Sequence, residues 1–328
     1  MPPEVLEMRG LSTQDFTGSS FRQNAKRIFH ATRPKFFPAS VLPVVAGSAW
    51  GFHVAGQFDV VACLLALVAT ACVHAGANVL NDVGDEFGGT DRDNEDRIYP
   101  YTGGSRFIQA GIMSVSGMAR LGISLLSVAA VAGLILLWMR GWVVLGFGLA
   151  GVLLAVTYSL GPLKLASIGF GEAAVGVAFG VLPVCGAAWL QSGVIDLDAI
   201  LFSIPVSAWV ASILLINEVP DIHPDGQNGK RTLPVRLGLN GTALLYLGIQ
   251  LAAFVAVIAM IVRGQLPIAA LLVPAGLLLF VYKASTAIRA GIAHRQRMTA
   301  AIEGTLAIHT LGCIWLTAVP LYLAFFHA

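Results

Sequence analysis

The sequence has few charged residues. Only 12% of its 328 residues are Asp, Glu, Lys or Arg, and 56% are hydrophobic. A soluble domain carries roughly 25% charged residues. This scarcity of charge excludes an ordinary soluble domain and indicates a chain that lives in a lipid bilayer, and we expect no nucleic-acid partner.

Cysteine is also scarce, and no pair has the CxxC spacing of a metal or redox site. The four cysteines, all within apolar runs, are Cys63, Cys72, Cys185 and Cys313. Cysteines in such surroundings behave as small core residues. We therefore expect neither disulfides nor thiolate metal ligands.

Long apolar runs are abundant. A membrane-spanning helix needs about 20 mostly apolar residues, and nine runs qualify: 37–57, 60–80, 119–139, 142–160, 168–190, 199–217, 243–262, 267–286 and 305–326. In lipid the backbone must satisfy its own hydrogen bonds, and these runs are too long for barrel strands. The sequence predicts an all-α membrane protein with nine transmembrane helices, consisting of a polar cytoplasmic segment (1–30) and a single transmembrane domain (31–328).

The distribution of basic residues predicts the orientation. Of the 20 Lys and Arg, only Arg140 and Arg263 fall in the loops after the third and seventh runs. The others lie in the N-terminal segment, in the loops after even-numbered runs or beside those runs. Because basic residues stay on the cytoplasmic side, we predict a cytoplasmic N-terminus in a multi-pass protein of the cell (inner) membrane.

Two acidic segments directly follow the second and sixth runs, on the predicted cytoplasmic face. The first reads Asn78-Val-Leu-Asn81-Asp82-Val-Gly-Asp85-Glu86, and the second reads Asn217-Glu218-Val-Pro-Asp221-Ile-His-Pro-Asp225. Carboxylates at the end of a span are costly and persist mainly where something positive binds them. Residues three and four apart share a helix face, so the first segment presents its acids on one side of a helix. Two prolines make an unbroken helix unfavourable in the second segment and suggest a turn at Asp225.

These side chains have the chemistry of a magnesium and diphosphate site. Carboxylates and amide carbonyls are hard oxygen ligands that suit Mg²⁺. Basic residues follow each acidic segment, and the turn Thr102-Gly-Gly-Ser-Arg106 can offer backbone N–H groups and a guanidinium to phosphate. A single Asp at a helix end is more often a solvated cap, so the hypothesis depends on both segments facing one side of the membrane.

The combination of motifs resembles the UbiA superfamily of intramembrane prenyltransferases. The resemblance covers most of the chain and includes Arg33-Pro34-Lys35, the two acidic segments, Thr102–Arg106, Tyr158-Ser-Leu-Gly-Pro-Leu-Lys164 and Asn228-Gly-Lys230-Arg231-Thr-Leu-Pro-Val-Arg236-Leu-Gly. Within the superfamily, the first and last of these stretches are most similar to the 1,4-dihydroxy-2-naphthoate polyprenyltransferases of menaquinone synthesis.

The resemblance implies a UbiA-type helical bundle and an Mg²⁺-dependent transfer of a polyprenyl group from polyprenyl diphosphate to an aromatic acceptor. Catalysis and metal binding would involve Asn81, Asp82, Asp85, Asp91, Asp221 and Asp225. The diphosphate would contact Arg97, Arg106, Tyr158, Lys164, Lys230 and Arg231. The acceptor would contact Arg33, Lys35, Asn78 and Asn217.

Two departures from the family pattern leave alternatives open. Position 89, where the family often has its third acid, is glycine here. Asp91 is the nearest later acid, with Asp93 and Glu86 as substitutes. Tyr158 and Lys164 are six residues apart, so either could reach the phosphate.

Rival interpretations remain at this stage. The acceptor could instead be 4-hydroxybenzoate or homogentisate, and less favourably a chlorophyllide or haem. A cation-coupled secondary transporter is the alternative from a different class, but its acids would lie near the midplane beside interrupted helices. We interpret Glu172 and Glu303 as acids at helix starts.

Overall fold

The computed structural model describes residues 16, 18–88, 98, 101–102, 104–159 and 163–326, without the side chains of Asp85, Gly88 and Ser159. These residues form helices and connecting loops, with no strand among them. The helices are α1 (Phe21–Ala31), α2 (Pro38–Ala55), α3 (Val60–Gly88), α4 (Val115–Arg140), α5 (Val143–Ser159), α6 (Gly171–Gly176), α7 (Leu182–Ser192), α8 (Leu197–Asn217), α9 (Ile222–Gln227), α10 (Leu233–Val262), α11 (Leu272–Ala290) and α12 (Arg295–Phe326). The predicted all-α fold is confirmed.

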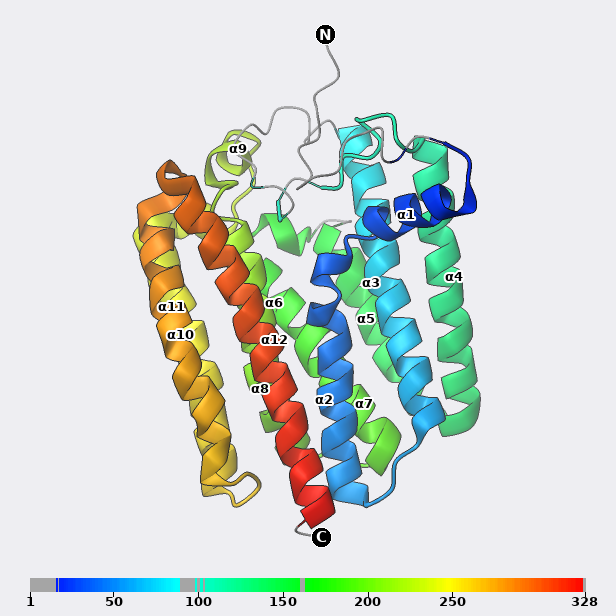
Figure 1. Ribbon diagram of the computed structural model, residues 1–328, viewed down its shortest axis with the longest axis vertical. Coiled ribbons are helices and arrows are strands. Elements are labelled where there is room, and N and C mark those ends of the chain that lie inside the picture. The colour runs from blue at the N-terminus through cyan, green and yellow to red at the C-terminus, as the bar shows by residue number, and fades with distance from the viewer. Residues whose placement is uncertain are drawn as a thin grey trace.

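The long helices run side by side, and two short helices lie at one end of the bundle. In Figure 1, α9 lies at the upper end and α1 runs crosswise over the upper parts of α3 and α4. The first acidic segment lies in the last turns of α3, and the second surrounds the start of α9. Both acidic segments are therefore at the same end of the bundle.

Seven stretches in the described part of the chain are long and apolar enough to cross a membrane. One of them, 268–326, is 59 residues long and contains both α11 and α12, while the apolar helix Val143–Tyr158 falls below the length of the others. Nine spans and a cytoplasmic N-terminus therefore stay predictions.

Local sequence explains where several helices begin and end. Ser114 caps α4 by accepting a hydrogen bond from the Gly117 N–H, and Asp196 caps α8 by accepting one from the Ala199 N–H at 2.8 Å. Gly56 ends α2 with a φ of +67°, which is in the left-handed region that favours glycine.

The second acidic segment differs from its prediction in one respect. The predicted turn at Asp225 is wrong, because Asp225 lies within α9. Pro224 is the third residue of that helix, where a backbone N–H has no partner inside the helix to lose. The break falls earlier, between the end of α8 at Asn217 and the N-cap of α9 at Asp221.

Small residues bring the central helices close together. A Cβ at Gly47 would lie 2.2 Å from the carbonyl oxygen of Val184, so α2 and α7 are in backbone contact there. Trp50 on α2 stacks on Phe202 of α8 with ring centroids 4.8 Å apart. These contacts pack α2 against α7 and against α8, the helix that the second acidic segment follows.

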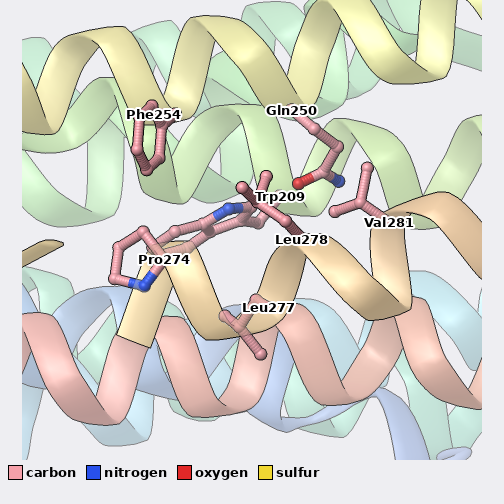
Figure 2. A pocket seen from close by; sticks show the side chains of 7 residues that line it. All are labelled: Trp209, Gln250, Phe254, Pro274, Leu277, Leu278 and Val281. Atoms are coloured by element: carbon pink, nitrogen blue, oxygen red, sulfur yellow. The ribbon is translucent and has the colours of Figure 1, made fainter. Parts of the chain in front are cut away.

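An apolar pocket opens between α8, α10 and α11, away from the acidic segments (Figure 2). Its lining residues are Trp209, Gln250, Phe254, Pro274, Leu277, Leu278 and Val281. Gln250 is its polar member and donates to the Ser212 hydroxyl at 3.0 Å. With no charged or metal-ligating residue in its lining, this pocket does not offer the chemistry predicted from the sequence.

Candidate active site

Asp82 is the best-defined acid of the first segment. Asp82 is only 3% exposed, although it lies near the end of α3. Its Oδ1 forms an ion pair with the Arg33 guanidinium, and its Oδ2 accepts hydrogen bonds from both the hydroxyl and the backbone N–H of Ser105, the latter at 3.1 Å. Three segments far apart in sequence thus converge on one carboxylate.

Asn78 lies one turn before Asp82 and faces the same neighbouring segment. Its amide nitrogen donates to the carbonyl oxygen of Thr32 at 3.2 Å. Because Thr32 directly precedes Arg33, the predicted common face of Asn78 and Asp82 is confirmed. One turn deeper, His74 Nδ1 lies 2.8 Å from the Ser40 hydroxyl, so His74 is a buried, hydrogen-bonded residue.

The remaining predictions for the first segment are only partly described. Asn81 is exposed on α3, and Glu86 accepts a hydrogen bond from Gln109 at 2.9 Å. Asp85 lies in α3, but its side chain is not among the described ones. Asp91, Asp93 and Arg97 lie outside the described residues.

The second segment places its acids around α9. Asp221 is the N-cap residue, and Asp225 follows one turn later, with its N–H bonded to the Asp221 carbonyl oxygen at 2.9 Å. The Lys230 ammonium lies 3.0 Å from the Asp225 carboxylate. Asn217, half-buried, is the last residue of α8.

The loop after α5 contacts the basic loop that follows α9. The Arg231 N–H donates to the Ser167 carbonyl oxygen at 2.8 Å, which ties residues 163–170 to Arg231. Lys164 is exposed in that loop, and Tyr158 is half-buried in the last turn of α5. The structure thus brings Tyr158, Lys164 and Arg231 to one region.

Backbone strain at this end is concentrated on basic residues. Among the described residues, the non-glycine ones with left-handed φ are Arg33 (54°), Arg106 (55°) and Lys164 (41°). Such conformations cost on the order of 1–3 kcal/mol and persist where surrounding contacts hold them, often at functional sites. All three were predicted from the sequence as phosphate or acceptor contacts.

Lys35 points toward a different neighbour from Arg33. Its ammonium lies 5.5 Å from the centre of the Tyr101 ring, and the Tyr101 hydroxyl donates to Glu303 of α12 at 2.8 Å. The interpretation of Glu303 as a helix-start acid is wrong, because α12 begins at Arg295, more than two turns earlier, and Glu303 instead accepts a hydrogen bond from Tyr101. The two basic residues expected at the acceptor occupy separate positions.

Sequence reasoning missed two neighbouring acids, the buried Glu172 and the half-buried Glu218. Glu172 is 4% exposed in the first turn of α6, and Glu218 follows the last residue of α8. Burial, followed by the nearby Glu172 and then by Asp225 and Asp221, raises the pKa of Glu218 to about 10. The signal was present in the sequence, since Glu172 lies within the apolar run 168–190 and Glu218 directly follows the run 199–217.

The side chains at this end of the bundle include the type of ligand atom that magnesium prefers. Asp82, Asp221 and Asp225 offer hard oxygen ligands, and no cysteine competes with them. In the described part of the chain, however, no three His, Cys, Asp or Glu side chains come together as a metal-binding group. The Asp82 oxygens are instead engaged by Arg33 and Ser105.

Comparison with protein families gives a match to the UbiA prenyltransferase family over residues 40–300. The chain belongs to this family. It is therefore a prenyltransferase, as predicted, and a multi-pass membrane protein with several apolar helices.

Named relatives show which members of the UbiA family this chain is similar to. The chain is 33% identical to a 1,4-dihydroxy-2-naphthoate octaprenyltransferase of Escherichia coli over 63% of this chain and 67% of that protein. It is 31% identical to a protein of the same name from Mycobacterium tuberculosis, over 67% of this chain and 73% of that one. The predicted resemblance to the 1,4-dihydroxy-2-naphthoate polyprenyltransferases within the UbiA family is thus confirmed.

Solved structures share the fold. A UbiA homolog from Archaeoglobus fulgidus bound to GPP and Mg²⁺ matches with a TM-score of 0.64 and 14% identity, over 89% of this chain and 100% of that chain. An apo UbiA homolog from Aeropyrum pernix also gives a TM-score of 0.64, with 18% identity, over 87% and 96% of the two chains. At these identities the matches establish the UbiA fold.

Proposed function

We propose that this UbiA-family protein transfers a polyprenyl group from polyprenyl diphosphate to 1,4-dihydroxy-2-naphthoate, with Mg²⁺ as cofactor. The observation that carries the proposal is the gathering of buried and half-buried Asp side chains with Arg and Lys at one end of an apolar helical bundle. The names of the relatives in Escherichia coli and Mycobacterium tuberculosis support the choice of acceptor.

The acids would hold the metal and through it the donor. Asp82, Asp221 and Asp225 would be ligands of the metal, and Asn81, Asp85 and Asp91 would complete the set. Mg²⁺, when bound, supplies positive charge that stabilises a leaving diphosphate. Because Asp82 is paired with Arg33 here, Arg33 would exchange that partner for a substrate group when the site is loaded.

The basic side chains would bind the diphosphate. Lys230, Arg231 and Arg106 carry fixed positive charge at this end, with Lys164, Tyr158 and Arg97 as further contacts. Charges aimed at the leaving group are worth more in a site that excludes water. They lower the barrier to breaking the allylic C–O bond, whose electron pair leaves with the diphosphate.

The acceptor would approach from the Arg33 side. Arg33 would bind its carboxylate, and Asn78 and Asn217 would be hydrogen-bonding neighbours, while Lys35, which lies against Tyr101, would contact another part of the acceptor. The ring carbon that carries the carboxylate attacks the allylic cation and forms the new C–C bond. Loss of CO₂ returns its electron pair to the ring, so the ring regains aromaticity without an external oxidant.

The active site would face the cytoplasm in the inner membrane. The distribution of Lys and Arg among the loops supports this orientation. The polyprenyl tail would extend between helices into the lipid.

A panel assay tests the acceptor. Purified protein is given a polyprenyl diphosphate, Mg²⁺ and in turn 1,4-dihydroxy-2-naphthoate, 4-hydroxybenzoate and homogentisate, with products detected by mass. We expect a decarboxylated, prenylated naphthoate product. A product formed only from 4-hydroxybenzoate or homogentisate would change the proposed acceptor and leave the reaction class as proposed. The absence of product with every acceptor would favour the cation-coupled secondary transporter.

A further inference from the structure

Helix α1 has an apolar face that no described part of the chain covers. Phe21, Ala25, Ile28 and Phe29 follow the i, i+4, i+7, i+8 spacing of one helix face. Phe21 is 88% exposed, Ile28 45% and Phe29 56%, and Ala25 is also exposed. The N-terminus of the helix is fixed by a capping box between Ser20 and Gln23, so this is a defined helix and not a loose turn.

The opposite face of α1 is basic and contacts the protein. Lys26 lies 5.2 Å from the centre of the Phe16 ring, and His30 packs edge-on against the same ring at 5.5 Å. Phe16 in turn packs on Phe107 in a small core cluster that also contains Ala31. The helix therefore attaches through its polar face and its C-terminal end, the reverse of an ordinary surface helix.

The charge of α1 has one sign. Arg22, Lys26 and Arg27 are basic, and the helix contains no acid. Burial and the neighbouring Lys26 and Lys35 lower the pKa of His30, so the positive charge comes from the other three residues. A short helix with a clustered apolar face and a cationic polar face is typical of helices that lie in a membrane interface.

The position of α1 supports the same reading. It runs crosswise to the long helices, at the end of the bundle where α3 ends with the first acidic segment and α4 begins (Figure 1). Those two helices belong to candidate membrane spans. A helix in this orientation at the end of the spans lies parallel to a bilayer surface.

We propose that α1 lies in the membrane interface on the side of the acidic segments, with Phe21, Ala25, Ile28 and Phe29 among the acyl chains and Arg22, Lys26 and Arg27 at anionic headgroups. The proposal rests on the membrane placement in the proposed function. It gives α1 a role in fixing the approach to the site, because Arg33, the partner of Asp82, follows the helix by two residues.

Spin-label accessibility tests the placement. The four native cysteines are replaced in the full chain, and single nitroxides are placed through Ala25→Cys, Arg27→Cys and Leu134→Cys. Arg27 lies on the opposite side of α1, and Leu134 is a 63% exposed residue within α4. The protein is reconstituted in vesicles of phosphatidylglycerol and phosphatidylcholine, and collisions with oxygen and with a water-soluble nickel chelate are measured.

We expect the oxygen-to-nickel accessibility ratio at position 25 to approach that at position 134 and to exceed that at position 27 severalfold. A ratio typical of water exposure at position 25, together with a ratio typical of lipid exposure at position 134, would overturn the proposal for α1 and leave the membrane placement intact. Water-like ratios at both would overturn the membrane placement itself. Spin–spin broadening at position 25 would show that a second copy covers the face, which also overturns the proposal.

The lipid composition tests the headgroup charge. In vesicles of phosphatidylcholine alone, nickel access at position 25 should rise at least about twofold, because the basic residues lose their anionic partners. Unchanged access would overturn the assignment of Arg22, Lys26 and Arg27 to anionic headgroups. Position 134, within a span, should give the same ratio in both lipids.

Discussion

At the scale of single residues, the site depends on charges held in places where they are costly. Asp82 is buried and has Arg33 and Ser105 as partners, and the half-buried Glu218 lies near Glu172, where burial and that acid raise its pKa to about 10. Unpaired charges in such surroundings would be strongly unfavourable. These residues therefore give the sharpest tests of the proposed chemistry.

Removing an acid from either segment should stop turnover. We expect Asp82→Ala and Asp221→Ala to lower kcat by at least about a hundredfold, because each removes a ligand whose charge is needed as the diphosphate leaves. Asp59→Ala is the matched control, since Asp59 pairs with Arg140 at the opposite end of α3. Near-normal kcat in an acidic-segment variant that still folds would remove that residue from the site.

Lys230 should affect the donor more than the acceptor. We expect Lys230→Ala to raise KM for the polyprenyl diphosphate about tenfold, through loss of a charge-assisted contact. The acceptor KM should change little. Arg263→Ala, at the far end of α10 and paired with Asp198, is the control. The reverse ranking of the two KM values would contradict a phosphate role.

Glu218 should make the stability of the metal-free protein depend on pH. Its pKa rises from an ordinary 4.5 to about 10, so between these values the folded state keeps a proton that the unfolded state releases. Stability is then fullest below pH 4.5 and falls as pH rises toward 10, by up to about 1.4 kcal/mol per pH unit from this group. Unfolding temperatures in detergent and EDTA should therefore decline with pH in wild type and much less in Glu218→Gln. Equal slopes would contradict the burial of this acid.

At the scale of helices, close backbone contacts set the packing. A Cβ at Gly180 would lie 2.4 Å from Ser207 Cα, and one at Gly47 would lie 2.2 Å from the Val184 carbonyl oxygen. We expect Gly180→Ala and Gly47→Ala to lower stability by about 1–3 kcal/mol, because backbone must move to admit the methyl group. Gly133→Ala, where nothing lies within 4 Å, should be neutral in the same thermal assay. Equal stability of all three variants would contradict these helix contacts.

The apolar runs predicted the helices inside the bundle well, but they did not predict the polar turns that extend those helices. The run 243–262 predicted the part of α10 that follows a kink at Gly238 (φ +63°), but not the turns from Leu233 before it, and α12 begins at Arg295 before the predicted 305. Hydropathy cannot detect helical turns that continue past a span into polar surroundings. The crosswise α1 was missed for the same reason, since its apolar residues lie on one face of an 11-residue helix.

The candidate site was predictable in its residue types but not in its pairings. Spacing on a helix identified the shared face of Asn78 and Asp82, which contact the adjacent residues Thr32 and Arg33. The partner Ser105 comes from a loop whose path depends on tertiary packing. Glu172 does lie in the first turn of a helix, as interpreted, but its burial was not predicted, because one sequence does not reveal which helix ends are buried.

At the scale of the whole molecule, both acidic segments and the basic residues that follow them lie at one end of the apolar bundle, while the ion pairs Asp59–Arg140 and Asp198–Arg263 lie at the other end. Under the proposed function, this arrangement would let the charged end bind the diphosphate while the donor tail stays in lipid. It predicts that activity requires a divalent cation and both acidic segments together.

The most direct test of this account is a magnesium titration of prenyl transfer. Wild type, Asp82→Ala and Asp59→Ala are purified, stripped with EDTA and assayed by product mass with polyprenyl diphosphate and 1,4-dihydroxy-2-naphthoate at increasing Mg²⁺. We predict no product without Mg²⁺, product from wild type and Asp59→Ala as Mg²⁺ is added, and none from Asp82→Ala at any concentration. Product formed by the stripped wild type, or by Asp82→Ala at wild-type rates, would contradict it.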